Sequence, residues 1–122
     1  MKIMIVDDHS GFRQVVRTMI QSTGAEIVEC EDGAQALKQY PLCRPDLVLM
    51  DIEMRGLDGL QATARIKASF PTARILMLTQ YDDPELRVAA RKAGAAGYVL
   101  KDNLSQLPTN IHEILDANSR AG

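Results

Sequence analysis

Five residues of this 122-residue chain have the types and the spacing that phosphoryl chemistry needs. Asp7, Asp8 and Asp51 are carboxylates, Thr79 carries a hydroxyl group, Lys101 carries an ammonium group, and each stands close behind a short apolar run. Carboxylates that lie close together repel one another unless a cation sits between them. Oxygen ligands suit a hard ion such as Mg²⁺, and a carboxylate can attack phosphorus when the phosphoryl charge is neutralised. The set therefore predicts a site with a nucleophile, a metal cage, a cation and a hydroxyl donor.

Taken singly, these residues have more ordinary interpretations. Two adjacent acids commonly cap a helix or end a strand in solvent, and a lone threonine or lysine carries almost no information. His9, beside the acids, is the one nitrogen candidate, and we interpret it as the start of a helix rather than a metal ligand. Because no cysteine or histidine pairs stand near the acids, the pattern disfavours zinc. The prediction depends on all these groups meeting in the folded chain.

Short apolar runs alternate with amphipathic stretches of helical length along the whole chain. We predict five strands, at residues 2–6, 25–30, 46–50, 74–78 and 97–100. The helices predicted after them cover residues 12–20, 34–40, 60–69, 83–94 and 107–115. Pro41 is expected to stop the second helix, whereas Pro84 and Pro108 are tolerated in the first turns of the fourth and fifth.

This alternation predicts the fold class α/β. Five successive strand–helix units with right-handed crossovers form a doubly wound, five-stranded parallel sheet, for which we expect the flavodoxin-like strand order 2-1-3-4-5. In such a sheet the functional crevice lies beyond the carboxyl ends of the strands, near the switch in strand order. The first, third, fourth and fifth strands would deliver the candidate residues to that edge.

Composition is consistent with one globular domain and excludes several classes. Hydrophobic residues make up 46% and charged residues 25%, and the net charge of -2 gives no electrostatic basis for binding nucleic acid or a membrane surface. No apolar run approaches the roughly 20 residues that span a bilayer. The apolar start is too short for a signal peptide, and we expect a cytoplasmic protein. Cys30 and Cys43 are expected to remain free, as small buried or half-buried residues.

Several segments resemble the response-regulator receiver domains of two-component signalling, in order and over essentially the whole chain. The matching segments are Ile5-Val6-Asp7-Asp8, Leu49-Met50-Asp51-Ile52-Glu53-Met54, Gly56-Leu57-Asp58-Gly59, Leu78-Thr79 and Tyr98-Val99-Leu100-Lys101. The resemblance implies a five-stranded switch that is phosphorylated on Asp51 by a histidine kinase or phosphotransfer protein and is not a turnover enzyme. It implies that Asp7, Asp8, Asp51 and the backbone carbonyl of Glu53 hold Mg²⁺, for which Mn²⁺ could substitute. Thr79 and Lys101 would contact the phosphoryl group.

The resemblance also implies a conformational switch. It couples Thr79 to the aromatic side chain of Tyr98, which alters the surface of the fourth helix, fifth strand and fifth helix. Glu53 and Tyr81 occupy the positions at which family members tune dephosphorylation. The sequence departs from the family at Arg55 and Asp102, where proline is frequent, and we therefore expect a trans peptide between Lys101 and Asp102. Arg55 would make its loop more mobile or more accessible to a partner.

The segment 6–9 together with Leu100-Lys101-Asp102 resembles the receiver subclass that precedes LuxR-type helix-turn-helix DNA-binding domains. We predict a receiver domain at residues 1–117, followed at 118–122 by a tail or the start of a linker. The chain is then a fragment of a transcription regulator, which we favour, or a stand-alone receiver. No DNA-binding element is expected within it, and a homodimer formed on phosphorylation is a hypothesis.

Other function classes compete with this interpretation. A receiver-fold adaptor that works by protein contacts alone usually lacks an acid or the lysine, whereas this chain keeps the full set. A Mg²⁺-dependent aspartyl-phosphate hydrolase typically places its nucleophile after the first strand and needs a substrate cap. A flavodoxin must cradle a phosphate with backbone N–H groups in its first loop, where Asp7 and Asp8 would repel it.

Overall fold

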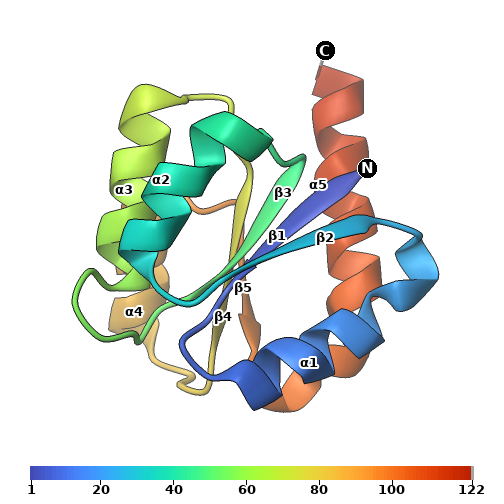
Figure 1. Cartoon of the computed structure of the whole chain (residues 1–122), viewed down its shortest axis with the longest axis horizontal. Coiled ribbons are helices and arrows are strands. Elements are labelled where there is room, and N and C mark those ends of the chain that lie inside the picture. Colours follow the sequence, from blue (N-terminus) through green and yellow to red (C-terminus); the bar gives the residue numbers. More distant parts are fainter. Residues whose placement is uncertain (122) are drawn as a thin grey trace.

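The chain folds around a central parallel sheet in which every strand is five residues long or shorter. The computed structural model describes the backbone of residues 1–121 and the side chains of residues 1–116. The strands are β1 (Lys2–Val6), β2 (Glu26–Cys30), β3 (Leu47–Asp51), β4 (Ile75–Thr79) and β5 (Gly97–Leu100). All neighbouring pairs are parallel and the order is β2-β1-β3-β4-β5, which confirms the predicted doubly wound topology (Figure 1).

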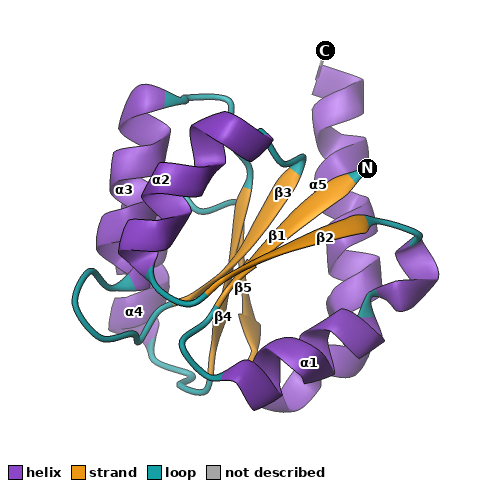
Figure 2. Cartoon of the chain, in the orientation of Figure 1, coloured by secondary structure: helices purple, strands orange, loops and turns teal. Residues whose placement is uncertain are grey.

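Helices cover both faces of this sheet (Figure 2). They are α1 (Ser10–Met19), α2 (Gly33–Cys43), α3 (Gly59–Ser69), α4 (Pro84–Ala93) and α5 (Leu107–Ala121), with short 3₁₀ turns at Gln21–Thr23 and Lys101–Gln106. The helices α1 and α5 lie on one face, and α2, α3 and α4 lie on the other (Figure 1). Within the described part of the chain, no helix combines the length and apolar character needed to cross a membrane.

The central strands are apolar at consecutive positions because both of their faces are buried. In β1, Ile3 and Ile5 pack under α1 and α5, whereas Met4 and Val6 pack under α2 and α3, and all four are at most 1% exposed. The strands β3 and β4 repeat this alternation. Two continuous apolar layers therefore pack against the two faces of the sheet and fix the ends of β1, β3 and β4.

Helix α2 corrects one prediction, because Pro41 does not end it. The helix continues to Cys43 with Pro41 inside its last turn. A proline so close to the end removes one N–H and little else, and the backbone N–H of Arg44 then donates to the carbonyl of Tyr40 at 2.8 Å. Arg44 closes the helix in the left-handed region, with φ of 48°.

Other features at the element ends agree with the sequence. Helix α4 begins at Pro84 behind an Asp83 cap and closes on Gly94, as predicted. Among the described residues all peptide bonds are trans, which includes the bond between Lys101 and Asp102. Both cysteines are free thiols. The helix α5 continues to Ala121, so the backbone of residues 118–121 belongs to it, and the division of the chain at residue 117 stays a prediction.

Candidate functional site

The predicted site residues meet at the carboxyl edge of the sheet. Asp51 and Thr79 are the last residues of β3 and β4 and take part in the strand ladders, opposite Leu78 and Leu100 respectively. The sequence placed them just after their strands, and this one-residue difference means that the ladders themselves hold them. Asp7 follows β1 directly and its N–H donates to the carbonyl of Cys30 at 3.1 Å. The fold therefore positions these side chains through strands rather than through mobile loops.

Asp51 lies at the most confined point of this edge. Its residue is only 5% exposed, and Gly59 at the start of α3 presses against its backbone. A Cβ at Gly59 would lie 2.0 Å from the Asp51 carbonyl oxygen, so only glycine fits there. The first turn of α3 and the strand β3 thus fix Asp51 from both sides.

Three carboxylates gather here, and their charge is only partly balanced. Ligand oxygens of Asp7, Asp8 and Asp51 all lie within 4.8 Å of one another. Burial raises the pKa of Asp51 from 3.8 to about 6; the negative charge of Asp7 contributes to that rise, and Lys101 counteracts it. A cation between these oxygens would relieve the repulsion among the carboxylates, so the cluster can bind a metal ion.

Lys101 reaches into the cluster from the end of β5. Its Nζ lies 2.9 Å from Asp7 Oδ2 and 3.3 Å from Asp51 Oδ1. The centre of the Phe12 ring lies 4.2 Å from the same nitrogen, so the ammonium group is held between two carboxylates and an aromatic face. The sequence predicted Phe12 only as an apolar position on a helix, because helical spacing does not distinguish a core side chain from one that faces a cation.

His9 begins the first helix, as predicted. Its Nδ1 accepts a hydrogen bond from the backbone N–H of Phe12 at 3.1 Å, and its own N–H donates to Asp7 Oδ1 at 2.8 Å. The imidazole therefore caps α1, while its backbone helps to orient an acid of the cluster.

A cavity of about 380 Å³ opens over these groups. It is lined by Asp8, His9, Phe12, Asp51, Glu53, Thr79, Gln80, Tyr81 and Lys101. Glu53 and Tyr81 are exposed at its rim, where the sequence placed them beside the phosphoacceptor. Gln80 was not predicted, since a polar residue after a strand carries no signal of its own; its amide donates to the Tyr81 hydroxyl at 2.9 Å.

Thr79 and Tyr98 are linked through the backbone of Tyr81. The Tyr81 N–H donates to Thr79 Oγ1 at 3.2 Å, and the Tyr98 hydroxyl donates to the Tyr81 carbonyl at 2.6 Å. Burial raises the pKa of Tyr98, and the nearby Thr79 hydroxyl group and the charge of Arg87 oppose that rise. The Arg87 guanidinium lies 4.5 Å from the Tyr98 ring centre. A hydroxyl in the cavity is therefore connected to an aromatic ring on β5 and to α4.

Arg55 lies outside this cavity but beside it. It is exposed and lines a second cavity of about 430 Å³ together with Asp8, His9, Glu31 and Asp32. The residue that departs from the family pattern thus faces the acids at the adjoining loops rather than the interior of the site.

Comparison with known proteins agrees with the geometry. The model of the response regulator receiver domain family matches residues 3–112, and the chain therefore belongs to this family of phosphoacceptor signalling modules, which are not turnover enzymes. Membership implies a histidine kinase as the partner.

Sequence relatives are of two lengths. The chemotaxis protein CheY of Listeria monocytogenes is 33% identical over 122 residues, which cover 99% of this chain and 98% of that protein. The uncharacterized transcriptional regulatory protein YhcZ of Bacillus subtilis is 41% identical over 104 residues, which cover 84% of this chain and 49% of that protein. The chain thus spans about half the length of the transcriptional regulators among these relatives.

Solved structures share the fold closely. A LuxR-family two-component response regulator from an Aurantimonas species superimposes with a TM-score of 0.91 at 34% identity, over 95% of this chain and 85% of the other. The signal receiver domain of the Mycobacterium tuberculosis response regulator NarL gives a TM-score of 0.86 at 29% identity, over 94% of this chain and 95% of the other.

Proposed function

We propose that Asp51 accepts a phosphoryl group from the phosphohistidine of a histidine kinase or phosphotransfer protein. One observation carries this proposal: four separate strand ends bring a buried carboxylate, two more acids, a hydroxyl group and an ammonium group to one edge of the sheet, where a single cavity opens. A structural role for each residue alone gives no reason for them to meet at one place.

The chain's own residues supply positioning and charge. A carboxylate oxygen of Asp51 forms a bond to phosphorus while the bond from phosphorus to the donor nitrogen breaks, and the nitrogen keeps the electron pair. Lys101, already 3.3 Å from Asp51, neutralises charge on a phosphoryl oxygen, and Thr79 donates a hydrogen bond to another. Glu53 and Tyr81 at the rim control how water reaches the acyl phosphate.

The donor set fits Mg²⁺, with Mn²⁺ as a substitute, because it offers three carboxylates in close reach of one another. Asp7, Asp8 and Asp51 would hold the ion together with the backbone carbonyl of Glu53. When bound, the ion neutralises the negative charge that accumulates on the phosphoryl oxygens.

Phosphorylation is proposed to act on the α4, β5 and α5 surface through Thr79. Only the phosphorylated chain offers a phosphoryl oxygen to Thr79 and Lys101, and differential contacts of this kind shift a conformational equilibrium. A movement of the Thr79 hydroxyl changes the hydrogen bonds of Tyr81 and hence the position of Tyr98.

The output is proposed to be a transcription-regulator effector domain, supported by relatives that are named transcriptional regulators and are about twice as long as their match to this chain. A homodimer formed on phosphorylation is the proposed assembly, and the cytoplasm is the proposed location. We propose that residues 1–121 bind neither nucleic acid nor a membrane.

The test is the intact mass of the chain after incubation with acetyl phosphate and Mg²⁺. One added phosphoryl group is expected in the wild type and none in Asp51→Asn or in the presence of a chelator. If the wild type binds Mg²⁺ and still gains no mass, the unphosphorylated adaptor replaces this proposal. Sedimentation with and without a phosphoryl mimic tests the dimer.

A further inference from the structure

Every polar atom of Asp7 has a partner in the folded chain. Its N–H donates to the Cys30 carbonyl, its Oδ1 accepts from the His9 N–H, and its Oδ2 accepts from Lys101. Its backbone carbonyl accepts from Nη1 of Arg13. The first three contacts hold the strand end and the carboxylate, whereas the fourth holds the carbonyl of the peptide that joins Asp7 to Asp8.

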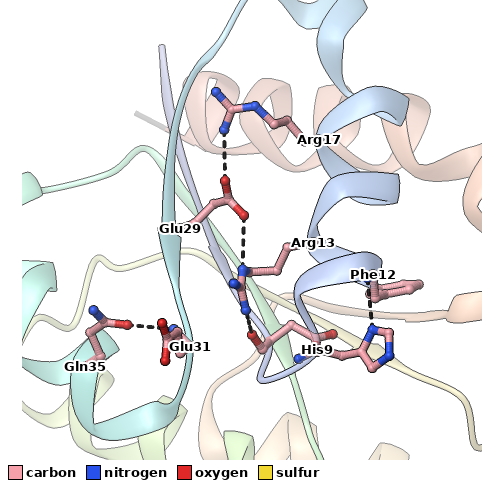
Figure 3. A network of polar contacts seen from close by, with 8 residues as sticks. His9, Phe12, Arg13, Arg17, Glu29, Glu31 and Gln35 are labelled. Atoms are coloured by element: carbon pink, nitrogen blue, oxygen red, sulfur yellow. Dashed lines mark hydrogen bonds and ion pairs between the residues drawn. The ribbon is translucent and has the colours of Figure 1, made fainter.

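Arg13 is itself fixed from a second direction (Figure 3). Its Nε donates to Glu29 Oε1 at 3.0 Å, and its side chain is only 13% exposed. The other oxygen of Glu29 accepts from Arg17 at 3.2 Å, one helical turn further along α1, where the arginine side chain is 46% exposed. The guanidinium of Arg13 therefore bridges the β1–α1 loop to β2, and Glu29 sets its plane.

Asp8 is the acid that depends most on this bridge. Its residue is exposed, and among the described residues no hydrogen bond to its carboxylate is formed. A side chain without such contacts is located by its backbone. Because a peptide unit is planar, the direction of the Asp7 carbonyl also sets where the Asp8 N and Cα lie.

We infer that Arg13 is a positioning residue for the metal site: by holding the Asp7 carbonyl it places Asp8 within reach of Asp7 and Asp51. This inference rests on the Mg²⁺ site of the proposed function. Lysine cannot replace arginine in this role, since the role needs two N–H donors in one rigid plane, one for Glu29 and one for Asp7. Arg17 contacts the same carboxylate without joining it to the acids, so it offers a matched comparison.

The experiment measures the Mg²⁺ dissociation constant of the whole chain by calorimetric or NMR titration with MgCl₂. R13K keeps the charge and removes the fork, and R17K makes the same change one turn away. Removal of a group that orients a metal ligand typically weakens binding by 10–100-fold, and for R13K we expect about tenfold. For R17K we expect a change within about twofold, because the Asp7 carbonyl keeps its donor.

The outcomes distinguish two roles of Arg13: positioning of the metal site, and a clamp, that is, a contact between α1 and β2 that only stabilises the fold. A clamp that only stabilises the fold lowers the melting temperature of both variants and leaves the Mg²⁺ dissociation constant unchanged, since folded molecules alone bind. Equal Mg²⁺ affinity in R13K and wild type, or equal loss in R13K and R17K, overturns the inference. If R13K does not fold, Glu29→Ala decides, because it removes the acceptor that sets the plane of the Arg13 guanidinium and leaves Arg13 in place; unchanged Mg²⁺ affinity there also overturns it. A wild type that binds no Mg²⁺ removes the metal site of the proposed function as well.

Discussion

Replacement of Asp51 by asparagine should make the metal-free protein more stable. Burial and the neighbouring Asp7 raise the pKa of Asp51 from 3.8 to about 6, so the folded chain disfavours the ionised carboxylate relative to the unfolded chain. Asparagine has the same shape and never ionises. The substitution therefore removes a penalty, even though it also removes one partner of Lys101, which keeps its 2.9 Å contact with Asp7.

The sign and the size of the effect follow from the same shift. When folding raises the pKa of a carboxyl group, the group costs the folded chain no stability at a pH well below its pKa in the unfolded chain. The penalty grows as the pH rises and is complete above its pKa in the folded chain. At about 1.4 kcal/mol for each tenfold change in proton affinity, the penalty is roughly 3 kcal/mol at pH 8 and roughly 1 kcal/mol at pH 4.5. For a chain of this length, 3 kcal/mol corresponds to an increase of roughly 10 °C in the melting temperature.

The assay is thermal unfolding followed by circular dichroism in a chelator, from pH 4.5 to pH 8. Glu113→Gln removes the same charge from an exposed position on α5 and is the control, for which we expect little change at any pH. Added Mg²⁺ should raise the melting temperature of the wild type more than that of Asp51→Asn, because a ligand stabilises the state that binds it. A variant that is less stable than the wild type at pH 8, or a difference independent of pH, would refute the electrostatic account of the site.

Three further predictions concern neighbouring features. Gly59→Ala should lower the free energy of unfolding, measured with denaturant, by roughly 2 kcal/mol or more and should weaken phosphorylation, since its Cβ would lie 2.0 Å from the Asp51 carbonyl oxygen. A neutral effect would contradict that close approach. Iodoacetamide at pH 8 should label the half-buried Cys43 and spare Cys30, because Cys30 is 0% exposed and burial raises its pKa to about 11. Peptide masses measure the labelling of each cysteine, and equal labelling would show that the Cys30 thiol opens to solvent. Lys101→Met should bind Mg²⁺ severalfold more tightly in a titration, because the acids lose a competing cation, while acetyl phosphate labels it more slowly; weaker Mg²⁺ binding would contradict this balance.

The fold and the centre of the site could be predicted because both depend on local sequence patterns. A strand buried on both faces needs consecutive apolar residues, and such runs at β1, β3 and β4 identify the sheet. A parallel sheet brings the carboxyl ends of its strands to one edge, so the residues that follow those runs are candidates on the strength of their position in the sequence. Asp7, Asp51, Thr79 and Lys101 are predicted in this way.

The supporting contacts could not be predicted because they join elements that are far apart in sequence. Arg13 and Glu29 look like ordinary polar positions on a helix and a strand, and their pairing depends on how α1 lies against β2. Phe12 looks like any apolar residue of an amphipathic helix, and only the fold shows that Lys101 Nζ lies 4.2 Å from the centre of its ring. The prediction for Pro41 was wrong for a related reason: a proline stops a helix only where lost hydrogen bonds matter, and its position in the last turn depends on where the chain leaves α2.

These supporting contacts explain how three acids coexist before any cation binds. Lys101 and Arg13 both contact Asp7, one at the carboxylate and one at the carbonyl, so the folded chain already carries two positive groups at the cluster. A divalent ion that binds there would replace part of an existing attraction between the acids and these positive groups, which would lower its affinity. Phosphorylation of Asp51 would add negative charge and draw Lys101 toward the phosphoryl oxygens, away from Asp7. Mg²⁺ affinity should then rise, and by linkage Mg²⁺ must stabilise the phosphorylated state by the same factor. In the proposed function the acids, the lysine and the arginine would act as one balance of charge, in which the metal ion and the phosphoryl group each favour the binding of the other.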